Sequence, residues 1–189
     1  MDIGITGTAG VGKSLFAGML KKSIPSFTII ELNDVANKYD LFSGTDKEGT
    51  KIVKIAALNS KVKGLLEEAG GGGVALVGHL LPELNLKLDM VFVVRADLEE
   101  LIKRLEARGY RFEKIRENII AEALDYCGVN SGHISNDLFE IEGKAGMERA
   151  IDSIMARMGG SEAAELPRNP IDKMPELFSL IKGANKYRF

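Results

Sequence analysis

The sequence lacks the features that mark secreted or membrane-spanning proteins. Its 189 residues contain a single cysteine, Cys127, so no internal disulfide can form, and a reducing compartment, the cytoplasm, is expected. No apolar run approaches the roughly 20 residues that cross a bilayer, and no basic segment with a cleavage site begins the chain, so neither membrane insertion nor secretion is expected. The formal net charge of −2 gives no sign of a nucleic-acid-binding protein.

The chain does contain apolar runs that alternate with stretches of helical periodicity, as is typical of parallel strands joined by crossover helices. Strands are predicted at about 2–6, 27–32, 73–78, 89–95 and 137–142. Helices are predicted at about 13–23, 32–39, 51–69, 97–108, 112–127 and 145–158, with a turn-rich connection over 40–50. The strands are apolar at consecutive positions, as expected when helices cover both faces of the sheet. The sequence therefore predicts an α/β fold with a five-stranded parallel sheet in a three-layer sandwich.

The composition changes after about residue 160. The length suits one domain, so we expect a core over 1–160 and a tail or arm over 161–189, with a short helix near 175–182. Prolines prevent one continuous helix in this tail: Pro167, Pro170 and Pro175. Three basic residues there are too small a footprint to predict direct nucleic-acid binding: Lys182, Lys186 and Arg188.

Residues 7–14, GTAGVGKS, lie between the first predicted strand and the first predicted helix and match G-x-x-x-x-G-K-[ST] at every fixed position. Gly7, Gly10 and Gly12 let the backbone curl so that successive N–H groups face phosphate oxygens, and the helix adds its positive N-terminal end. Lys13 would place its ammonium on the β- and γ-phosphates, and the Ser14 hydroxyl would coordinate Mg²⁺. The loop therefore predicts binding of a nucleoside triphosphate, with ATP expected.

A basic corner follows the predicted helix 97–108. Arg104 and Arg108 lie one turn apart near its end, and Arg111 begins the next helix after a Gly-Tyr break. Such a corner could form a lid that closes over the triphosphate and stabilises the transferring phosphoryl group. A solvated helix end, balanced by nearby glutamates, fits the pattern equally well, and charge alone leaves both interpretations open.

A carboxylate that organises magnesium is expected at the end of an apolar strand, but strand 73–78 ends without one. Asp97, after the next strand, is predicted to cap a helix N-terminus. Glu31 and Asp34, near the end of strand 27–32, are the remaining candidates, and each has a helix cap or a surface charge as its alternative.

The histidines and the cysteine have less specific surroundings. His79 directly follows strand 73–78, near where a phosphoryl acceptor would lie, and could orient a water or an acceptor phosphate; a loop histidine without a role is the alternative. His133, in a polar loop, is predicted to be a surface residue. Cys127 is predicted to be a small buried hydrophobic residue.

Five segments, in order, resemble the small adenylate kinase-like P-loop proteins of archaea and the eukaryotic nucleus, also known as ribosome-assembly ATPases. They are GITGTAGVGKS, ELNDVANKYDLFSGTD, VGHLLPEL, VFVVRADLEELIKRLEARGY and EKIRENIIAEAL. The resemblance extends over about residues 1–158. It implies a nucleoside monophosphate kinase topology, with an acceptor-nucleotide segment at about 31–54 and a short lid at about 107–117.

The resemblance also implies roles for individual residues. ATP and Mg²⁺ would be held by the glycine loop and the residues that follow it: Gly7, Gly10, Val11, Gly12, Lys13, Ser14 and Leu15. Arg108 would be the lid arginine, with Arg104 one turn earlier, and His79 the histidine of the family's Asp-x-His motif. AMP would lie against the acceptor segment: Asn33, Asp34, Asn37 and Lys38.

Two positions depart from the family's pattern. Val77 stands where the Asp-x-His motif places its aspartate, and the loss of that metal-organising group should cost on the order of 10²-fold in rate. The arginine that grips AMP in related kinases falls on Asn37, beside Lys38, whose charge is less geometrically defined.

The resemblance implies a Mg-dependent phosphotransferase that moves the γ-phosphoryl group of ATP to AMP and also hydrolyses ATP. Val77 and the divergent tail favour an alternative, a nucleotide-dependent ATPase that assists small ribosomal subunit assembly with a ribosomal protein or a subunit precursor as its partner. A kinase with a non-nucleotide acceptor is a third alternative, which the glycine loop permits and the lid segment disfavours.

Overall fold

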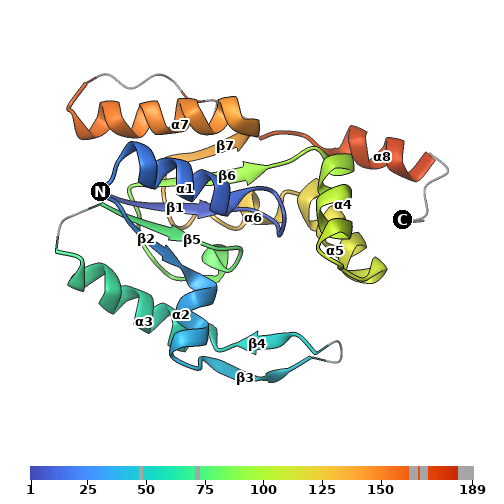
Figure 1. Cartoon of the computed structure of the whole chain (residues 1–189), viewed down its shortest axis with the longest axis horizontal. Helices are drawn as coiled ribbons and strands as arrows, with labels where there is room; N and C mark the ends of the chain where they lie inside the picture. Colours follow the sequence, from blue (N-terminus) through green and yellow to red (C-terminus); the bar gives the residue numbers. More distant parts are fainter. Residues whose placement is uncertain (47–48, 71–72, 162–165, 167–169, 183–189) are drawn as a thin grey trace.

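The central sheet of the protein is parallel and has the strand order β2-β5-β1-β6-β7 (Figure 1). The computed structural model describes residues 1–46, 49–70, 73–161, 166 and 170–182. The strands of this sheet are β1 Asp2–Thr6, β2 Thr28–Glu31, β5 Val74–Val77, β6 Met90–Arg95 and β7 Leu138–Glu142. All five predicted strands are confirmed, with bounds that differ by at most one residue from the expected ones.

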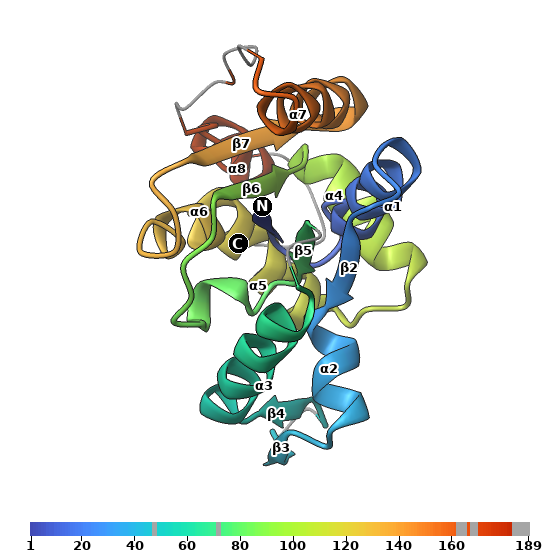
Figure 2. The same ribbon diagram turned by 90° about the vertical axis from the view of Figure 1, so that its left-hand side faces the viewer.

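Helices cover both faces of the sheet (Figure 2). One face packs against α1 Lys13–Ser23, α4 Leu98–Ala107, α5 Phe112–Ala123 and α7 Gly143–Met158. The other packs against α2 Leu32–Lys38, α3 Ile55–Glu68 and the short 3-10 turn η1 Leu81–Glu83. The predicted three-layer α/β sandwich is therefore confirmed.

Strand β6 shows why its apolar residues are consecutive. Phe92 and Val94 belong to the core on the α1 side, where the rings of Phe16 and Phe92 meet edge to face at 5.5 Å. Val91 and Val93 belong to the core on the α2 and α3 side. Because successive side chains of a strand point to opposite faces, a strand buried on both faces has no polar alternation.

The segment after α2 differs from the expectation. Residues of the predicted loop over 40–50 and of the predicted helix start at 51 form an antiparallel hairpin of β3 Phe42–Thr45 and β4 Lys51–Val53. Asp46 shapes its turn, because its Oδ1 accepts a hydrogen bond from the Thr50 N–H at 2.8 Å. The strands are short and mostly exposed, so they carry no apolar alternation that would predict them.

The single helix predicted over 112–127 is also wrong. Helix α5 ends at Ala123, and a separate short helix, α6 Tyr126–Val129, follows. Asp125 between them has a left-handed φ of 51°, and its Oδ1 accepts a hydrogen bond from the Gly128 N–H at 3.0 Å. This N-cap starts a new helix in a new direction.

A buried ion cluster lies at the carboxyl end of β6. Arg95, only 1% exposed, donates from Nε to Glu122 Oε1 at 2.8 Å and from Nη1 to Glu140 Oε2 at 2.6 Å. Its Nη1 also lies 3.0 Å from Asp125 Oδ1. Although burial opposes the positive charge, the carboxylates of Glu122, Asp125 and Glu140 raise the pKa of Arg95. The cluster therefore joins β6, α5 and β7 through the buried charges of Arg95, Glu122 and Glu140, with Asp125 at its partly exposed edge.

The short helix expected near 175–182 is α8 Met174–Lys182. Lys173, just before it, forms ion pairs with Glu142 at 2.5 Å and Glu176 at 2.8 Å, and Leu177 is buried in the core. The tail residues Lys186 and Arg188 lie outside the described residues. No helix in the described part of the chain is long and apolar enough to cross a membrane.

The stability of the protein should decrease as the pH rises through neutrality, because of Glu140. Burial raises the pKa of this carboxyl to about 7, with Asp125 nearby adding to the effect of burial and Arg95 and the Ile171 N–H opposing it. The folded state therefore holds a proton that the unfolded chain releases near its ordinary pKa of about 4.5. Between about pH 4.5 and 7 the free energy of unfolding should fall, and Glu140→Gln should remove this contribution.

Urea unfolding at pH 5, 6, 7 and 8 measures the slope for both proteins. The matched control is Glu148→Gln. Glu148 is exposed on α7, where it forms a surface ion pair with Lys144. An identical pH slope in the wild type and in Glu140→Gln would contradict the assignment.

Candidate active site

The glycine loop connects the carboxyl end of β1, the central strand of the sheet, to α1. Gly7, Gly10 and Gly12 have φ angles of 135°, 94° and 117°, a region that side chains rarely allow. A Cβ on Gly7 would lie 2.3 Å from the carbonyl oxygen of Val94, so glycine is required there. Gly12 is the N-cap of α1 and offers no side-chain acceptor, which leaves the first N–H groups of the helix for an external anion.

Lys13 curls back over the loop. Its Nζ donates hydrogen bonds to the carbonyl oxygens of Gly7 and Thr8, both at 2.8 Å. Burial lowers the pKa of Lys13 to about 8, and the nearby charge of Arg108 acts in the same direction. A half-buried ammonium held against the loop backbone is a strong attractor for a phosphate chain.

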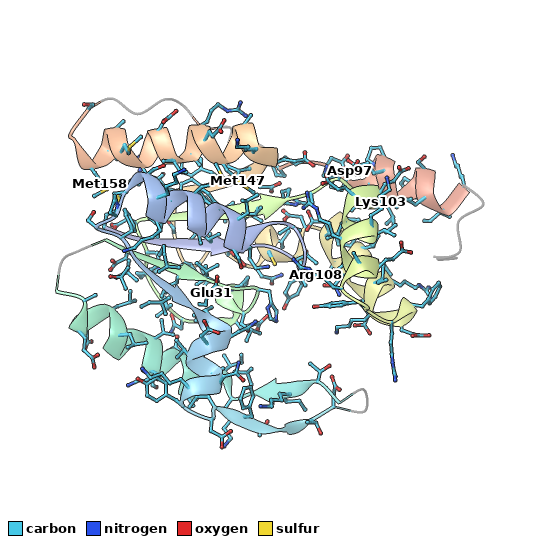
Figure 3. All side chains as sticks on the ribbon, viewed as in Figure 1. Glu31, Asp97, Lys103, Arg108, Met147 and Met158 are labelled. Atoms are coloured by element: carbon cyan, nitrogen blue, oxygen red, sulfur yellow. The ribbon has the colours of Figure 1, made fainter. Side chains whose placement is uncertain are left out.

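A cavity of about 310 Å³ opens on this loop. It gathers side chains from distant parts of the sequence: Lys13, Ser14, Leu15, Glu31, Asn33, His79, Arg108 and Tyr110. Glu31 comes from the end of β2 and Arg108 from the end of α4 (Figure 3). Within the described residues, Arg108 forms no ion pair, so its charge remains available to an anion in the cavity.

Ser14 and Glu31, which both line this cavity, contact each other. The Ser14 hydroxyl lies 3.3 Å from Glu31 Oε1, to which it donates a hydrogen bond. Burial raises the pKa of Glu31, and the hydrogen bond from Ser14 opposes that shift. This hydroxyl and this carboxylate are oxygen ligands of the kind that Mg²⁺ prefers.

His79 follows β5 and lies on the border of two cavities. It lines the phosphate-side cavity and also a second one of about 530 Å³. The surrounding protein, which partly desolvates the exposed ring, and the charges of Lys13 and Lys114 lower the pKa of His79 and so favour the neutral imidazole. A neutral ring can accept a hydrogen bond on one nitrogen and donate from the other.

The second cavity lies between α2, the β3–β4 hairpin and His79. Its walls combine two amides with hairpin and loop residues: Asn33, Asn37, Phe42, Thr50, Lys51, Ile52, Val53, Leu80 and Glu83. Asp34 and Lys38 are exposed and are not among the residues that line this cavity. The Lys38 ammonium instead lies 5.4 Å from the ring centre of Tyr39. Of the four predicted acceptor-site residues, the cavity therefore brings together Asn33 and Asn37.

A third cavity, of about 580 Å³, lies on the other side of the loop, between α4 and the start of α7. Val11, Leu15, Arg104, Arg108 and Met147 are among its lining residues. Arg104 points back to the loop, where its Nη1 donates to the carbonyl oxygens of Gly10 at 3.2 Å and Val11 at 3.3 Å, and it also pairs with Glu100. Arg104 thus braces the loop, whereas Arg108 reaches both cavities.

Sequence patterns did not indicate the contact between the glycine loop and helix α5. The Thr8 hydroxyl donates a hydrogen bond of 2.7 Å to Glu122 Oε2, while Glu122 Oε1 accepts from Arg95. A signal was present, because Glu122 falls on the apolar face of α5 with Ile115 and Ile119, where a charged residue needs a buried partner. The partner itself is far away in sequence and could not be named.

Three further sequence predictions concern residues to which no part in catalysis was assigned. Asp97 caps α4, since its Oδ1 accepts a hydrogen bond from the Glu100 N–H at 2.8 Å. His133 is exposed, with Nε2 at 2.9 Å from the Leu84 carbonyl oxygen, and Cys127 is buried. All three predictions are confirmed.

A glycine loop between the central parallel strand and a helix, with cationic side chains around it, defines a P-loop protein with the fold of nucleoside monophosphate kinases. Residues 3–125 match the family described as AAA domain. A solved shikimate kinase from Bacteroides thetaiotaomicron has the same fold, with a TM-score of 0.52 at 14% identity over 84% of this chain and 98% of that one.

Sequence relatives give the family. The chain is 32% identical over 176 residues to "Putative adenylate kinase" of Methanosarcina mazei, covering 82% of this chain and 89% of that protein. It is 36% identical over 125 residues to "Adenylate kinase isoenzyme 6 homolog FAP7" of Saccharomyces cerevisiae, covering 65% of this chain and 62% of that one. The protein belongs to the adenylate kinase-like P-loop family of archaea and eukaryotes.

Thr8→Val should destabilise the protein by about 1–3 kcal/mol, because it keeps the shape of the side chain but leaves a buried Glu122 oxygen without its donor. Equilibrium urea unfolding at pH 7 measures the difference. Thr28→Val, at an exposed position of β2, is the matched control and should change stability by less than about 0.5 kcal/mol. Equal stability of Thr8→Val and the wild type would show that the contact to Glu122 is not needed to hold the loop.

Proposed function

We propose that the protein is a cytoplasmic, Mg-dependent phosphotransferase that moves the γ-phosphoryl group of ATP to AMP. The position of His79 carries this proposal, because it borders both the glycine-loop cavity and the cavity beside α2 and the hairpin. Phosphoryl transfer needs donor and acceptor oxygens held in line at close range. Two adjoining cavities that meet at one side chain suit a transfer reaction between two bound molecules.

On the donor side, the loop N–H groups and Lys13 bind the phosphates of ATP. The cavity between α4 and α7 adjoins the same loop and has room for the base and ribose. Arg108 lines this cavity and the phosphate-side one, so its guanidinium can neutralise charge on the group in transfer. Arg104 keeps the loop in shape through Gly10 and Val11.

The residues around Ser14 fit a magnesium ion. No cluster of three or more His, Cys, Asp or Glu side chains that could hold a metal occurs among the described residues. Mg²⁺ in nucleotide sites takes most of its ligands from phosphates and water and few from the protein, so Ser14 with one nearby carboxylate is sufficient. When bound, the ion offsets the negative charge that develops on the phosphates.

On the acceptor side, AMP occupies the cavity lined by Asn33 and Asn37, and its phosphate faces His79. The neutral imidazole can donate a hydrogen bond to that phosphate without adding charge. The β3–β4 hairpin and the α4–α5 pair both lie beyond the carboxyl ends of the strands (Figure 1), where they can enclose the two nucleotides and exclude water.

Lys13→Ala should abolish phosphoryl transfer without unfolding the protein, because the substitution removes the cation at the phosphates and two hydrogen bonds within the loop but no residue of the hydrophobic core. The measurement is incubation with γ-labelled ATP and Mg²⁺, with and without AMP, followed by separation of the products. In the wild type, label should appear in ADP only when AMP is present. Lys22→Ala, on the exposed side of the same helix, should keep full activity. An undiminished rate in Lys13→Ala would contradict the proposal that the glycine loop binds the phosphoryl donor.

Val77 supports an alternative function, because a buried apolar side chain stands where the family's Asp-x-His motif has its acid. In that case the protein is a nucleotide-dependent ATPase that acts in small ribosomal subunit assembly with a ribosomal protein as its partner. Label would then appear as free phosphate at a rate indifferent to AMP. Different affinities of the ATP- and ADP-bound forms for a ribosomal partner would support it further.

Asn37→Arg should lower the KM for AMP by about tenfold, because a guanidinium can bind the acceptor phosphate with two hydrogen bonds where an amide cannot. The side chain would enter the cavity beside His79, which Asn37 already lines. Ser60→Arg, on the exposed side of α3, adds the same charge outside the cavity and should leave KM unchanged. If Asn37→Arg leaves the KM unchanged, AMP is not bound in this cavity.

A further inference from the structure

At the candidate site, strand β2 ends in a carboxylate, Glu31, whereas the neighbouring strand β5 ends in Val77. Strands β2 and β5 are neighbouring parallel strands, and Glu31 pairs in register with Val77. Val77 in turn pairs with Ile5 of β1, the strand that leads into the glycine loop. The two positions therefore lie at the same level of the sheet, one strand apart, and Glu31 is the acid at that level.

The side chain of Glu31 reaches the place where a metal would lie. Its Oε1 is 3.3 Å from Ser14 Oγ, although the two residues belong to different elements. In an octahedral site with bonds of 2.0–2.1 Å, neighbouring ligand oxygens are about 2.9 Å apart. The observed separation is close to that value, and both side chains line the phosphate-side cavity.

The two alternative roles that the sequence allowed for Glu31, a helix cap and a surface charge, do not fit the structure. Glu31 occupies the N-cap position of α2 but makes no side-chain capping hydrogen bond. It is half-buried, so it is not simply a surface charge. Within the described residues it forms no ion pair, and its hydrogen-bond partner is Ser14. Asp34, the second candidate, is exposed and is not among the residues lining the phosphate-side cavity.

We propose that Glu31 is the carboxylate that holds magnesium with Ser14, in place of the acid that is absent at Val77. The charge that the family places on β5 has moved to the adjacent strand in this protein, on a side chain that is one methylene longer. This inference rests on the proposed use of a magnesium nucleotide at the glycine loop. Glu31 is a positioning residue for the ion and takes no proton in the reaction.

The test is the effect of Mg²⁺ on nucleotide affinity, which needs no turnover. The affinity for the non-hydrolysable ATP analogue AMPPNP is measured by calorimetry in EDTA and in excess Mg²⁺, for the wild type and for Glu31→Gln. Without metal, Glu31→Gln should bind the analogue as well as the wild type or more tightly, because a negative charge near the phosphates is gone. With Mg²⁺, the gain in affinity should shrink by about 10- to 100-fold.

A variant with a general loss of structure would bind AMPPNP more weakly both with and without Mg²⁺. Glu31→Gln should instead lose affinity only when Mg²⁺ is present. Glu68→Gln, an exposed position at the end of α3, removes the same charge and should keep the full Mg²⁺ effect. The inference is overturned if Glu31→Gln keeps the full effect, or if Asp34→Asn loses it instead. Failure of the wild type to bind AMPPNP, or to respond to Mg²⁺, would overturn the proposed function itself, so the two failures are distinguishable.

Discussion

The ion cluster around Arg95 is the interaction on which the active-site geometry depends. Its guanidinium is enclosed by Glu122, Asp125 and Glu140, which come from α5, the α5–α6 junction and β7. Removal of one partner from a buried charge pair costs about 3–5 kcal/mol, because the other charge is left in a medium that cannot solvate it. Glu122 also accepts the hydrogen bond from Thr8, so the same cluster that joins the elements fixes the base of the glycine loop.

The tail continues this network to α4, the helix that carries Arg104 and ends at Arg108. Glu140 accepts a hydrogen bond from the Ile171 N–H at 2.7 Å, and Glu176 of α8 accepts one from the Leu98 N–H at 2.9 Å. The first turn of α4 is thus held by the tail, whereas its far end, which carries Arg108, is exposed. The described part of the tail is therefore connected to the site through α4 and Glu140, and its residues are not among those lining the three cavities.

Local patterns in the sequence were enough to predict the sheet, the loop and most of the helices. Buried strands such as β6 and the GTAGVGKS loop have short-range signatures, so these predictions were confirmed. The β3–β4 hairpin has no such signature, because its strands are short and exposed. The helix break after Ala123 lies beside Asp125, which pairs with Arg95, 30 positions earlier in the chain, and a local pattern does not reveal that pairing. The meeting of Ser14 with Glu31 likewise depends on which strands are neighbours, and single-sequence periodicity does not give strand order.

Side-chain hydrogen bonds fix the backbone of the glycine loop. Lys13 donates to the carbonyl oxygens of Gly7 and Thr8, and Arg104 donates to those of Gly10 and Val11, so four carbonyl oxygens of the loop are bonded to cations. Because Lys13 is largely desolvated in this state, phosphate binding exchanges carbonyl acceptors for anionic ones with little further loss of hydration. A loop held in this way loses little conformational entropy on binding, so more of the interaction energy with the phosphates appears as affinity. The same hydrogen bonds bear on the proposed metal site: a magnesium ion bound there would need only one charged protein ligand to define its position, because the loop and the neighbouring strand hold Ser14 and Glu31 in place.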